Sequence, residues 1–153
     1  MRLGLFVRAA VVAAGLVLPI GIGLKAADLS DFKNPLDGSP ITFKLQSGEV
    51  ETPAVKKFKE TGDNDYRGKA EAIAAGKALY EDNCIICHGA DGKGKLGPTL
   101  VGDKLIYKQA KSDPGMFSII YGGASGAMQS FANRGMKQDE MLKIVAYVRT
   151  LDK

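Results

Sequence analysis

The sequence CIICH at residues 84–88 contains both cysteines of this 153-residue chain and its only histidine. Two thiols separated by two residues and followed at once by an imidazole place three reactive side chains within about one helical turn. This cluster restricts the fold, because each type of site that contains these side chains needs different secondary structure or additional ligands around it. The candidates are a thiol redox pair, a zinc site and a covalent haem site.

A thioredoxin-like redox pair needs a strand before the first cysteine, but residues 70–82 have the composition of a helix. A structural zinc site needs about four protein ligands, and without a third cysteine or a second histidine only carboxylates could complete it. In the haem interpretation, Cys84 and Cys87 form thioethers with the vinyl groups and His88 binds the iron. We therefore expect one covalently bound haem c, with a disulfide or redox pair as the alternative.

The first 26 residues have the organisation of a secretory signal, with Arg2 and Arg8 before an apolar stretch that runs to Leu24. We predict cleavage after Ala26, within a residue, leaving no stable membrane insertion. An uncleaved membrane anchor is the alternative, because the apolar run approaches the ~17 residues that can span a bilayer. Export to the periplasm suits haem attachment, since an oxidising compartment otherwise favours a disulfide.

The net charge of +4 falls almost to zero when the predicted signal is removed. Three of the 21 basic residues lie in residues 1–26, which hold no acid, so 18 basic residues then face 17 acidic ones. The remaining lysines lack the clustered, aromatic-interleaved pattern of a nucleic-acid-binding surface. We expect no nucleic-acid partner. The length beyond the signal suits one domain, and the composition divides it into a polar extension, residues 27–69, and a helical region, residues 70–153.

The extension shows signs of a short hairpin and a helix. Ile41, Phe43 and Leu45 alternate with polar residues before a glycine turn, which predicts a strand and a hairpin that runs on through Val50. Thr52 then has the position of a helix N-cap, with proline next and Gly62 as the stop. This pattern predicts a helix over residues 53–61.

The helical region predicts three helices joined by glycine-rich loops. The first spans residues 70–82, and the last, residues 138–151, has apolar residues at helical spacing. Between them, Asp113 is expected to cap a short helix that begins at Pro114 and ends at Gly122. The whole pattern indicates a mainly α fold.

From GKALYEDNCIICHGADGKGKLGPTL to the C-terminal helix, the chain resembles class I cytochromes c. The resemblance covers residues 70–153 and implies a class I cytochrome c fold, with helices wrapped around one covalently bound haem. It implies that the Pro98 carbonyl accepts a hydrogen bond from the second ring nitrogen of His88, which orients the ring. Gly76 and Tyr147 resemble the pair at which the first and last helices of that family cross.

The second axial ligand of the iron is expected to be a methionine. Met1 belongs to the predicted signal, and Met116 and Met141 lie on apolar faces of predicted helices, where they are expected to be core residues. GASGAMQSF resembles the distal loop of the family, although glutamine stands where the family has proline after the methionine. This resemblance favours Met128, and leaves Met136 or no methionine ligand as alternatives.

With its only histidine bound to iron, the chain retains no residue set for acid–base or nucleophilic chemistry, so we expect an electron-transfer protein and not an enzyme. DFKNPLDGSPITF and TPAVKKFKETGDNDYRG in the extension, with YGGASGAM and DEMLKIVAYVRTL, resemble the cytochrome c-L family. That resemblance implies a periplasmic single-electron carrier that accepts electrons from a pyrroloquinoline-quinone (PQQ)-dependent methanol dehydrogenase and passes them to a downstream cytochrome c or oxidase.

Three other functions remain open. They are a general periplasmic cytochrome c for another dehydrogenase, a haem sensor with an open iron position, and a small haem subunit of a sulfur-oxidising complex. Between residues 89 and 112 five lysines face two acids, which are Lys93, Lys95, Lys104, Lys108, Lys111, Asp91 and Asp103. This excess could steer an acidic partner toward the haem motif, or be an ordinary solvated surface.

Overall fold

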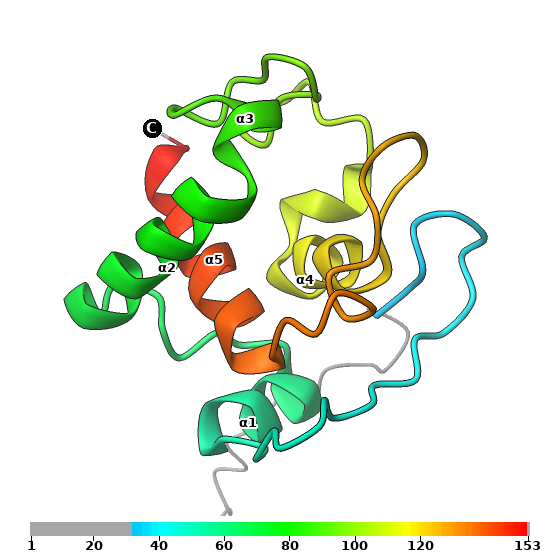
Figure 1. The fold of residues 1–153 in the computed structure, drawn as a ribbon, viewed down its shortest axis with the longest axis vertical. Helices are drawn as coiled ribbons and strands as arrows, with labels where there is room; N and C mark the ends of the chain where they lie inside the picture. The colour runs from blue at the N-terminus through cyan, green and yellow to red at the C-terminus, as the bar shows by residue number, and fades with distance from the viewer. Residues whose placement is uncertain (1–31, 153) are drawn as a thin grey trace, which may run out of the picture.

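The computed structural model describes residues 32–152, and the predicted signal peptide, residues 1–26, lies outside this range. The described elements are α1 (Pro53–Thr61), α2 (Ala70–Asn83), α3 (Ile85–His88), the 3₁₀ turn η2 (Lys108–Lys111), α4 (Asp113–Gly122) and α5 (Gln138–Leu151) (Figure 1). Each of the predicted helices is present. Among residues 32–152, no helix is both long enough and apolar enough to cross a membrane.

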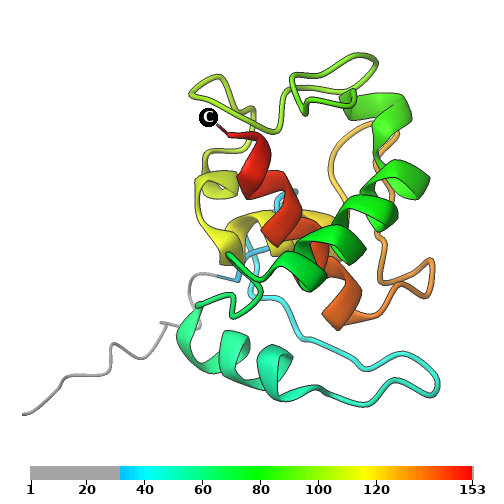
Figure 2. The same ribbon diagram turned by 90° about the vertical axis from the view of Figure 1, so that its left-hand side faces the viewer.

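Helices α2 and α5 cross closely, as the two views of the ribbon show (Figures 1 and 2). Gly76 is buried at the crossing, where a Cβ atom would overlap the carbonyl of Lys143. One turn farther along α5, Tyr147 packs edge-on against Tyr80, with ring centroids 5.3 Å apart. The small residue therefore allows the two backbones to approach, as its resemblance to the family's crossing glycine predicts.

Helix α1 follows its predicted boundaries. The Thr52 side chain accepts a hydrogen bond from Val55 N–H, and Gly62 ends the helix in the left-handed conformation, φ 75°. Its buried residues Val55 and Phe58 face the helical region. Here the rings of Phe32, Phe43 and Phe58 from the extension form a cluster with Phe117 and Tyr121 of α4, with centroid distances of 5.1–6.2 Å. The extension thus shares one hydrophobic core with the helical region.

The predicted hairpin is wrong. Residues 41–50 contain no strand, and within residues 32–152 the backbone pairs as a bridge only at Lys33 and Pro40. Side chains from distant helices replace the partner strand: Lys44 N–H donates to the Tyr121 hydroxyl at 2.8 Å, and the Lys44 carbonyl accepts from Gln138 at 3.1 Å. Only the turn near Gly48 matches the expectation, since Glu49 N–H donates to the Gln46 carbonyl.

The start of α4 also differs from the prediction, because Ser112 and not Asp113 is the N-cap. The Ser112 hydroxyl accepts a hydrogen bond from Gly115 N–H at 3.1 Å, and Asp113 is the first residue of the helix. The buried Asp113 carboxylate instead pairs with Arg149 of α5, whose Nε lies 2.7 Å away. Arg149 also donates to the Ala110 carbonyl at 2.9 Å, so one guanidinium joins α5, α4 and η2.

The opposite end of α5 is fixed to the extension. The Asp139 carboxylate accepts hydrogen bonds from Thr52 at 2.8 Å, Tyr66 at 2.5 Å and Lys143 at 2.7 Å. Nearby, the buried Asn64 side chain donates to the Leu142 carbonyl at 2.9 Å. These contacts hold the segment between α1 and α2 against the base of α5.

Candidate functional site

The two cysteines lie where one helix ends and another begins. Cys84 closes α2 with φ −121° and ψ −30°, and residues 85–88 form the single turn α3. The Cys84 carbonyl accepts hydrogen bonds from the N–H groups of Cys87 and His88, at 3.1 and 2.9 Å. This change of direction brings both thiols and the imidazole to the same cavity, which all three residues line.

His88 is buried and oriented by the loop that follows it. Its side chain is 7% exposed, and its Nδ1 lies 2.9 Å from the Pro98 carbonyl, the contact that the resemblance predicted. Gly97 lies directly over the ring, since a Cβ atom there would be 3.0 Å from His88 Cε1. If Nδ1 donates to Pro98, the Nε2 lone pair is left for a metal.

The loop after His88 contains Gly97 and Pro98 and spans residues 89–100, and we call it the Gly-Pro loop. Backbone hydrogen bonds attach it to residues 84–88, which we call the cysteine motif. The Cys87 carbonyl accepts from the N–H groups of Lys95 and Gly97, and the His88 carbonyl accepts from Gly94 N–H, all at 2.7–3.1 Å. Gly94 has φ +95°, and a side chain there would crowd the backbone of residues 97–99. The loop is therefore a rigid support for the proximal side of His88.

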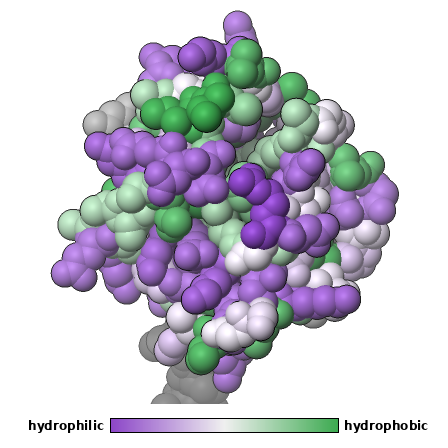
Figure 3. Space-filling view, viewed as in Figure 1, coloured by the Kyte–Doolittle hydropathy of each residue, from purple (hydrophilic) through white to green (hydrophobic). Residues whose placement is uncertain are grey.

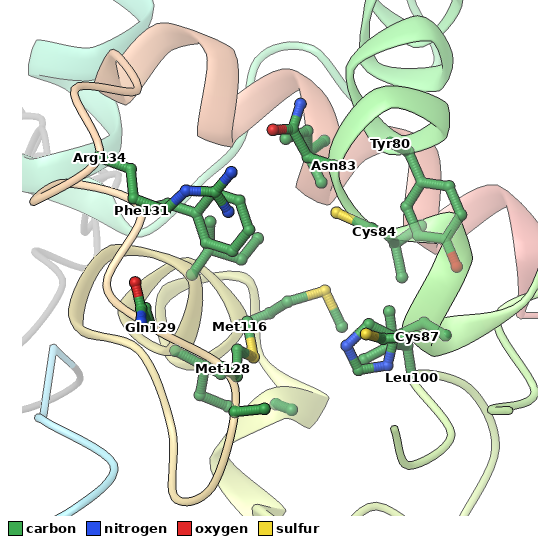
Figure 4. A pocket seen from close by; sticks show the side chains of 17 residues that line it. Tyr80, Asn83, Cys84, Cys87, Leu100, Met116, Met128, Gln129, Phe131 and Arg134 are labelled. Carbon is green, nitrogen blue, oxygen red and sulfur yellow. The ribbon is translucent and has the colours of Figure 1, made fainter. Parts of the chain in front are cut away.

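A largely apolar cavity with two lobes opens in front of the imidazole. The lobes have volumes of about 890 Å³ and 1110 Å³, which include space open to solvent, and both are lined by His88, Cys87 and Met128. In Figure 4, Cys84 and Cys87 lie on one side of the first lobe, and Met116, Met128 and Phe131 on the other. The cavity thus separates the cysteine motif from α4 and the loop after it.

Exposed apolar side chains border the second lobe. Leu96 and Ile106 line it and are 78% and 67% exposed, and Ile86, next to Cys87, is 70% exposed. Figure 3 shows hydrophobic surface over α3 and the loops that follow it. Nearby, Lys93 and Lys111 form surface ion pairs with Asp91 and Asp103, at 3.6 and 2.9 Å.

Met128 lies on the glycine-rich segment after α4, residues 123–131, which we call the distal loop. The loop turns at Gly123, which has φ +82° and where a Cβ atom would overlap the backbone of Met128 and Ser130. Ala124 N–H donates to the Met128 carbonyl at 2.8 Å, and the Ser130 hydroxyl donates to the Tyr121 carbonyl at 2.6 Å. These contacts place Met128 across the cavity from the cysteine motif.

The other methionines differ in their relation to the cavity. Met136 lines a different pocket, with Leu79 and Glu140, and Met141 is buried in the core. Met116 is 4% exposed, as expected for a core residue, but it also lines the first lobe. Helical periodicity identified Met116 as buried and could not show that its buried face borders the cavity.

The residues present fit a covalently held haem. An apolar cavity of this kind suits a flat apolar ring system, both thiols stand at its wall, and the oriented histidine faces a thioether-bearing loop. Burial raises the pKa of the Cys84 thiol to about 11, so this thiol is neutral in its apolar surroundings. Residues 32–152 contain no group of three or more His, Cys, Asp or Glu side chains that could hold a metal ion.

Comparison with known proteins agrees with this geometry. The family model for cytochrome c matches residues 73–152, which include the cysteine motif, the Gly-Pro loop, the distal loop and α5. The chain belongs to the cytochrome c family. Membership implies one covalently bound haem c, and proteins of this family transfer electrons and are not enzymes.

Within the family, this cytochrome is similar to cytochromes c-L. It is 38% identical over 121 residues to cytochrome c-L of Methylorubrum extorquens, an alignment that covers 78% of this chain and 61% of the relative. The cytochrome therefore spans about three fifths of the length of that relative. It also shares 36% identity over 91 residues with the FixP subunit of a cbb3-type cytochrome c oxidase from Bradyrhizobium diazoefficiens, covering 54% of this chain and 31% of the relative.

Two crystal structures have the same fold. Cytochrome c-L of Methylophaga aminisulfidivorans superposes with a TM-score of 0.75 at 38% identity, covering 79% of this chain and 80% of the other. Cytochrome c-L of Hyphomicrobium denitrificans gives 0.70 at 34% identity, covering 80% and 73%. The predicted mainly α class I cytochrome c fold is confirmed.

Proposed function

We propose that this cytochrome is a periplasmic single-electron carrier that accepts electrons from a PQQ-dependent methanol dehydrogenase and passes them to a downstream cytochrome c or oxidase. The observation that carries the proposal is the length of chain over which this protein is similar to cytochrome c-L. The alignment of 121 residues is longer than residues 73–152, so it includes part of the extension. A small cytochrome c without such an extension would match the haem region alone.

The extension is packed in a way that fits a specialised role. Its aromatic rings share the core with α4, and its backbone at Lys44 bonds to Tyr121 and Gln138. A segment held this firmly presents a fixed surface, which a partner protein can recognise without first ordering it. We infer that the extension contributes to the choice of the electron donor.

At the site, we propose that Cys84 and Cys87 hold the haem as thioethers and that His88 and Met128 bind its iron. Haem supplies a metal centre that gains and loses one electron. The chain supplies the rest: Pro98 and Gly97 orient the imidazole, the apolar lining excludes water, and the distal loop presents the thioether. Thioether ligation favours the ferrous state, which suits an electron acceptor.

Stopped-flow reduction of the purified holoprotein by purified methanol dehydrogenase tests this function. The dehydrogenase should reduce this cytochrome at least ten times faster than it reduces a small c-type cytochrome that lacks the extension. Equal rates for the two would contradict the proposed donor. Rapid reduction by a different dehydrogenase in a parallel assay would then favour a general periplasmic carrier.

A further inference from the structure

The part of the distal loop that carries Met128 has few bonds to hold it. Residues 125–127 are exposed, and Ala124 N–H closes the segment on itself by donating to the Met128 carbonyl at 2.8 Å. Among residues 32–152, the hydrogen bonds that connect residues 124–128 to another part of the chain both end on Tyr107. Ala124 and Met128 also pack against the hydrophobic core, but the hydrogen bonds from this segment to the rest of the described chain run through Tyr107 alone.

That attachment consists of two contacts to one hydroxyl. Ser125 N–H donates to the Tyr107 hydroxyl at 3.0 Å, and the Ser125 hydroxyl lies 2.8 Å from the same oxygen. Tyr107 and Ser125 line the second lobe of the cavity together with His88 and Met128. We call this pair the Tyr107–Ser125 clasp.

The clasp is anchored on a rigid wall. Tyr107 precedes η2, and its carbonyl accepts from Ala110 N–H at 3.0 Å. The Ala110 carbonyl in turn accepts from Arg149, which is also paired with the buried Asp113. Helix α4 lies directly on this turn, because a Cβ atom at Gly115 would overlap the backbone of Gln109. The tyrosine thus comes from a fixed part of the molecule.

We propose that Tyr107 is a positioning residue that holds Met128 in place as the iron ligand, through its hydrogen bonds to Ser125. The inference rests on the proposed role of Met128. Without the clasp, residues 124–128 keep their internal hydrogen bond and the packing of Ala124 and Met128 against the core, and the loop gains conformations in which the thioether lies away from the iron. An exposed glycine-rich segment can adopt many backbone conformations once it is released. Loss of the two contacts should therefore weaken the binding of the Met128 thioether to the iron by a measurable amount.

The experiment compares the wild-type holoprotein with Tyr107→Phe. Two measurements report on the iron ligand: the pH at which the ferric far-red band of methionine-ligated haem disappears, and the affinity of the ferric protein for added imidazole, which competes with methionine. Tyr107→Phe should bind imidazole roughly twofold to tenfold more tightly, the range for the net loss of one intramolecular hydrogen bond, because both contacts lie at an exposed position where water competes for them. The far-red band should disappear at a lower pH.

Tyr121→Phe is the matched control, since it also removes a tyrosine hydroxyl, but one that bonds the extension at Lys44. It should lower the unfolding temperature and leave the band and the imidazole affinity unchanged. If Tyr107→Phe matches the wild type in both measurements, the clasp proposal is overturned while ligation by a methionine stands. If the wild-type ferric protein itself lacks the band, the Met128 assignment fails, and the clasp with it.

Discussion

At the residue scale, the imidazole of His88 is held by contacts on two sides. The Pro98 carbonyl lies 2.9 Å from Nδ1, and the absence of a side chain at Gly97 leaves room for the ring. Gly97 does not adopt a positive φ, so the reason for glycine here is the close approach of the ring and not backbone strain. An added methyl group at Gly97 would therefore press directly on the imidazole of His88.

Gly97→Ala should destabilise the holoprotein by roughly 1–3 kcal/mol, the usual cost of overpacking, because the new Cβ atom would press on His88 Cε1. Chemical denaturation followed by haem absorbance measures this change. Gly122→Ala is the control, since its nearest neighbour would be Pro35 Cδ at an ordinary 3.7 Å. Equal stability of the two variants would show that the ring has room to move.

The two candidate methionines can be separated by isosteric substitution. Met128→Leu should abolish the ferric far-red band and allow the ferrous protein to bind carbon monoxide, because leucine has no thioether to bind iron. Met136→Leu should retain the band, since Met136 lines a different pocket. A band that survives Met128→Leu and disappears in Met136→Leu would reverse the assignment.

At the element scale, the crossing of α2 and α5 depends on Gly76. Alanine is the better helix former by up to about 1 kcal/mol, so propensity alone favours replacing this glycine. The carbonyl of Lys143 occupies the space that a Cβ atom would need, and a backbone group cannot move aside as a flexible side chain can. Packing therefore outweighs propensity at this position.

Gly76→Ala is expected to lower the free energy of unfolding by roughly 1–3 kcal/mol despite the gain in helix propensity. Ala74→Gly in the exposed face of the same helix should cost only about 0.5–1 kcal/mol. Both values come from urea denaturation of the holoprotein. If Gly76→Ala instead raised the free energy of unfolding, α2 and α5 could move apart without losing stability, and the packing argument would be wrong.

Local signals predicted the helices well, and long-range contacts explain where prediction failed. Thr52 and Gly62 identified α1 because caps act on their own helix. The alternation of Ile41, Phe43 and Leu45 suggested a hairpin, but the Lys44 backbone bonds to side chains 77 and 94 residues away. Likewise, Ser112 caps α4 and the Asp113 carboxylate pairs with Arg149, a partner 36 residues away that no local pattern shows.

The candidate site was predictable to the extent that its residues are adjacent in the sequence. Cys84, Cys87 and His88 form one motif, so their common location follows from the turn that contains them. Met116 and Tyr107 were missed as cavity residues, because only the packing of α4 and η2 brings them to the cavity. Tyr107 is far from the cysteine motif in the sequence and acts through its hydroxyl group, so no residue spacing in the sequence indicates its role.

At the scale of the whole molecule, the extension and the helical region are joined by charge as well as by aromatic packing. Burial alone would raise the pKa of Asp139, but hydrogen bonds from Lys143, Tyr66 and Thr52 outweigh burial and lower it below the ordinary value. A carboxyl group whose pKa is lower in the folded state stabilises the fold above its unfolded pKa, near 4, and loses that contribution as the pH falls through the folded value.

Asp139→Asn should therefore reduce the free energy of unfolding at neutral pH by roughly 1–3 kcal/mol and make its decline below about pH 4 shallower. Urea denaturation across a pH series measures both effects. Tyr66→Phe keeps the carboxylate and removes one donor, so its decline in acid should persist with smaller amplitude. An unchanged acid slope in Asp139→Asn would exclude this carboxylate as a source of the acid sensitivity.

The two-lobed cavity has a consequence for the biogenesis of the protein. Its walls come from α2, α3, α4 and the distal loop, and much of the apolar surface that they present has no protein partner. A chain of this size buries only a small hydrophobic core. Without haem, fewer apolar contacts hold the walls of the cavity together. Haem bound between those walls would give them a partner, and because a group held only by the folded state shifts the folding equilibrium toward that state, we expect the holoprotein to unfold at a higher temperature than the haem-free chain.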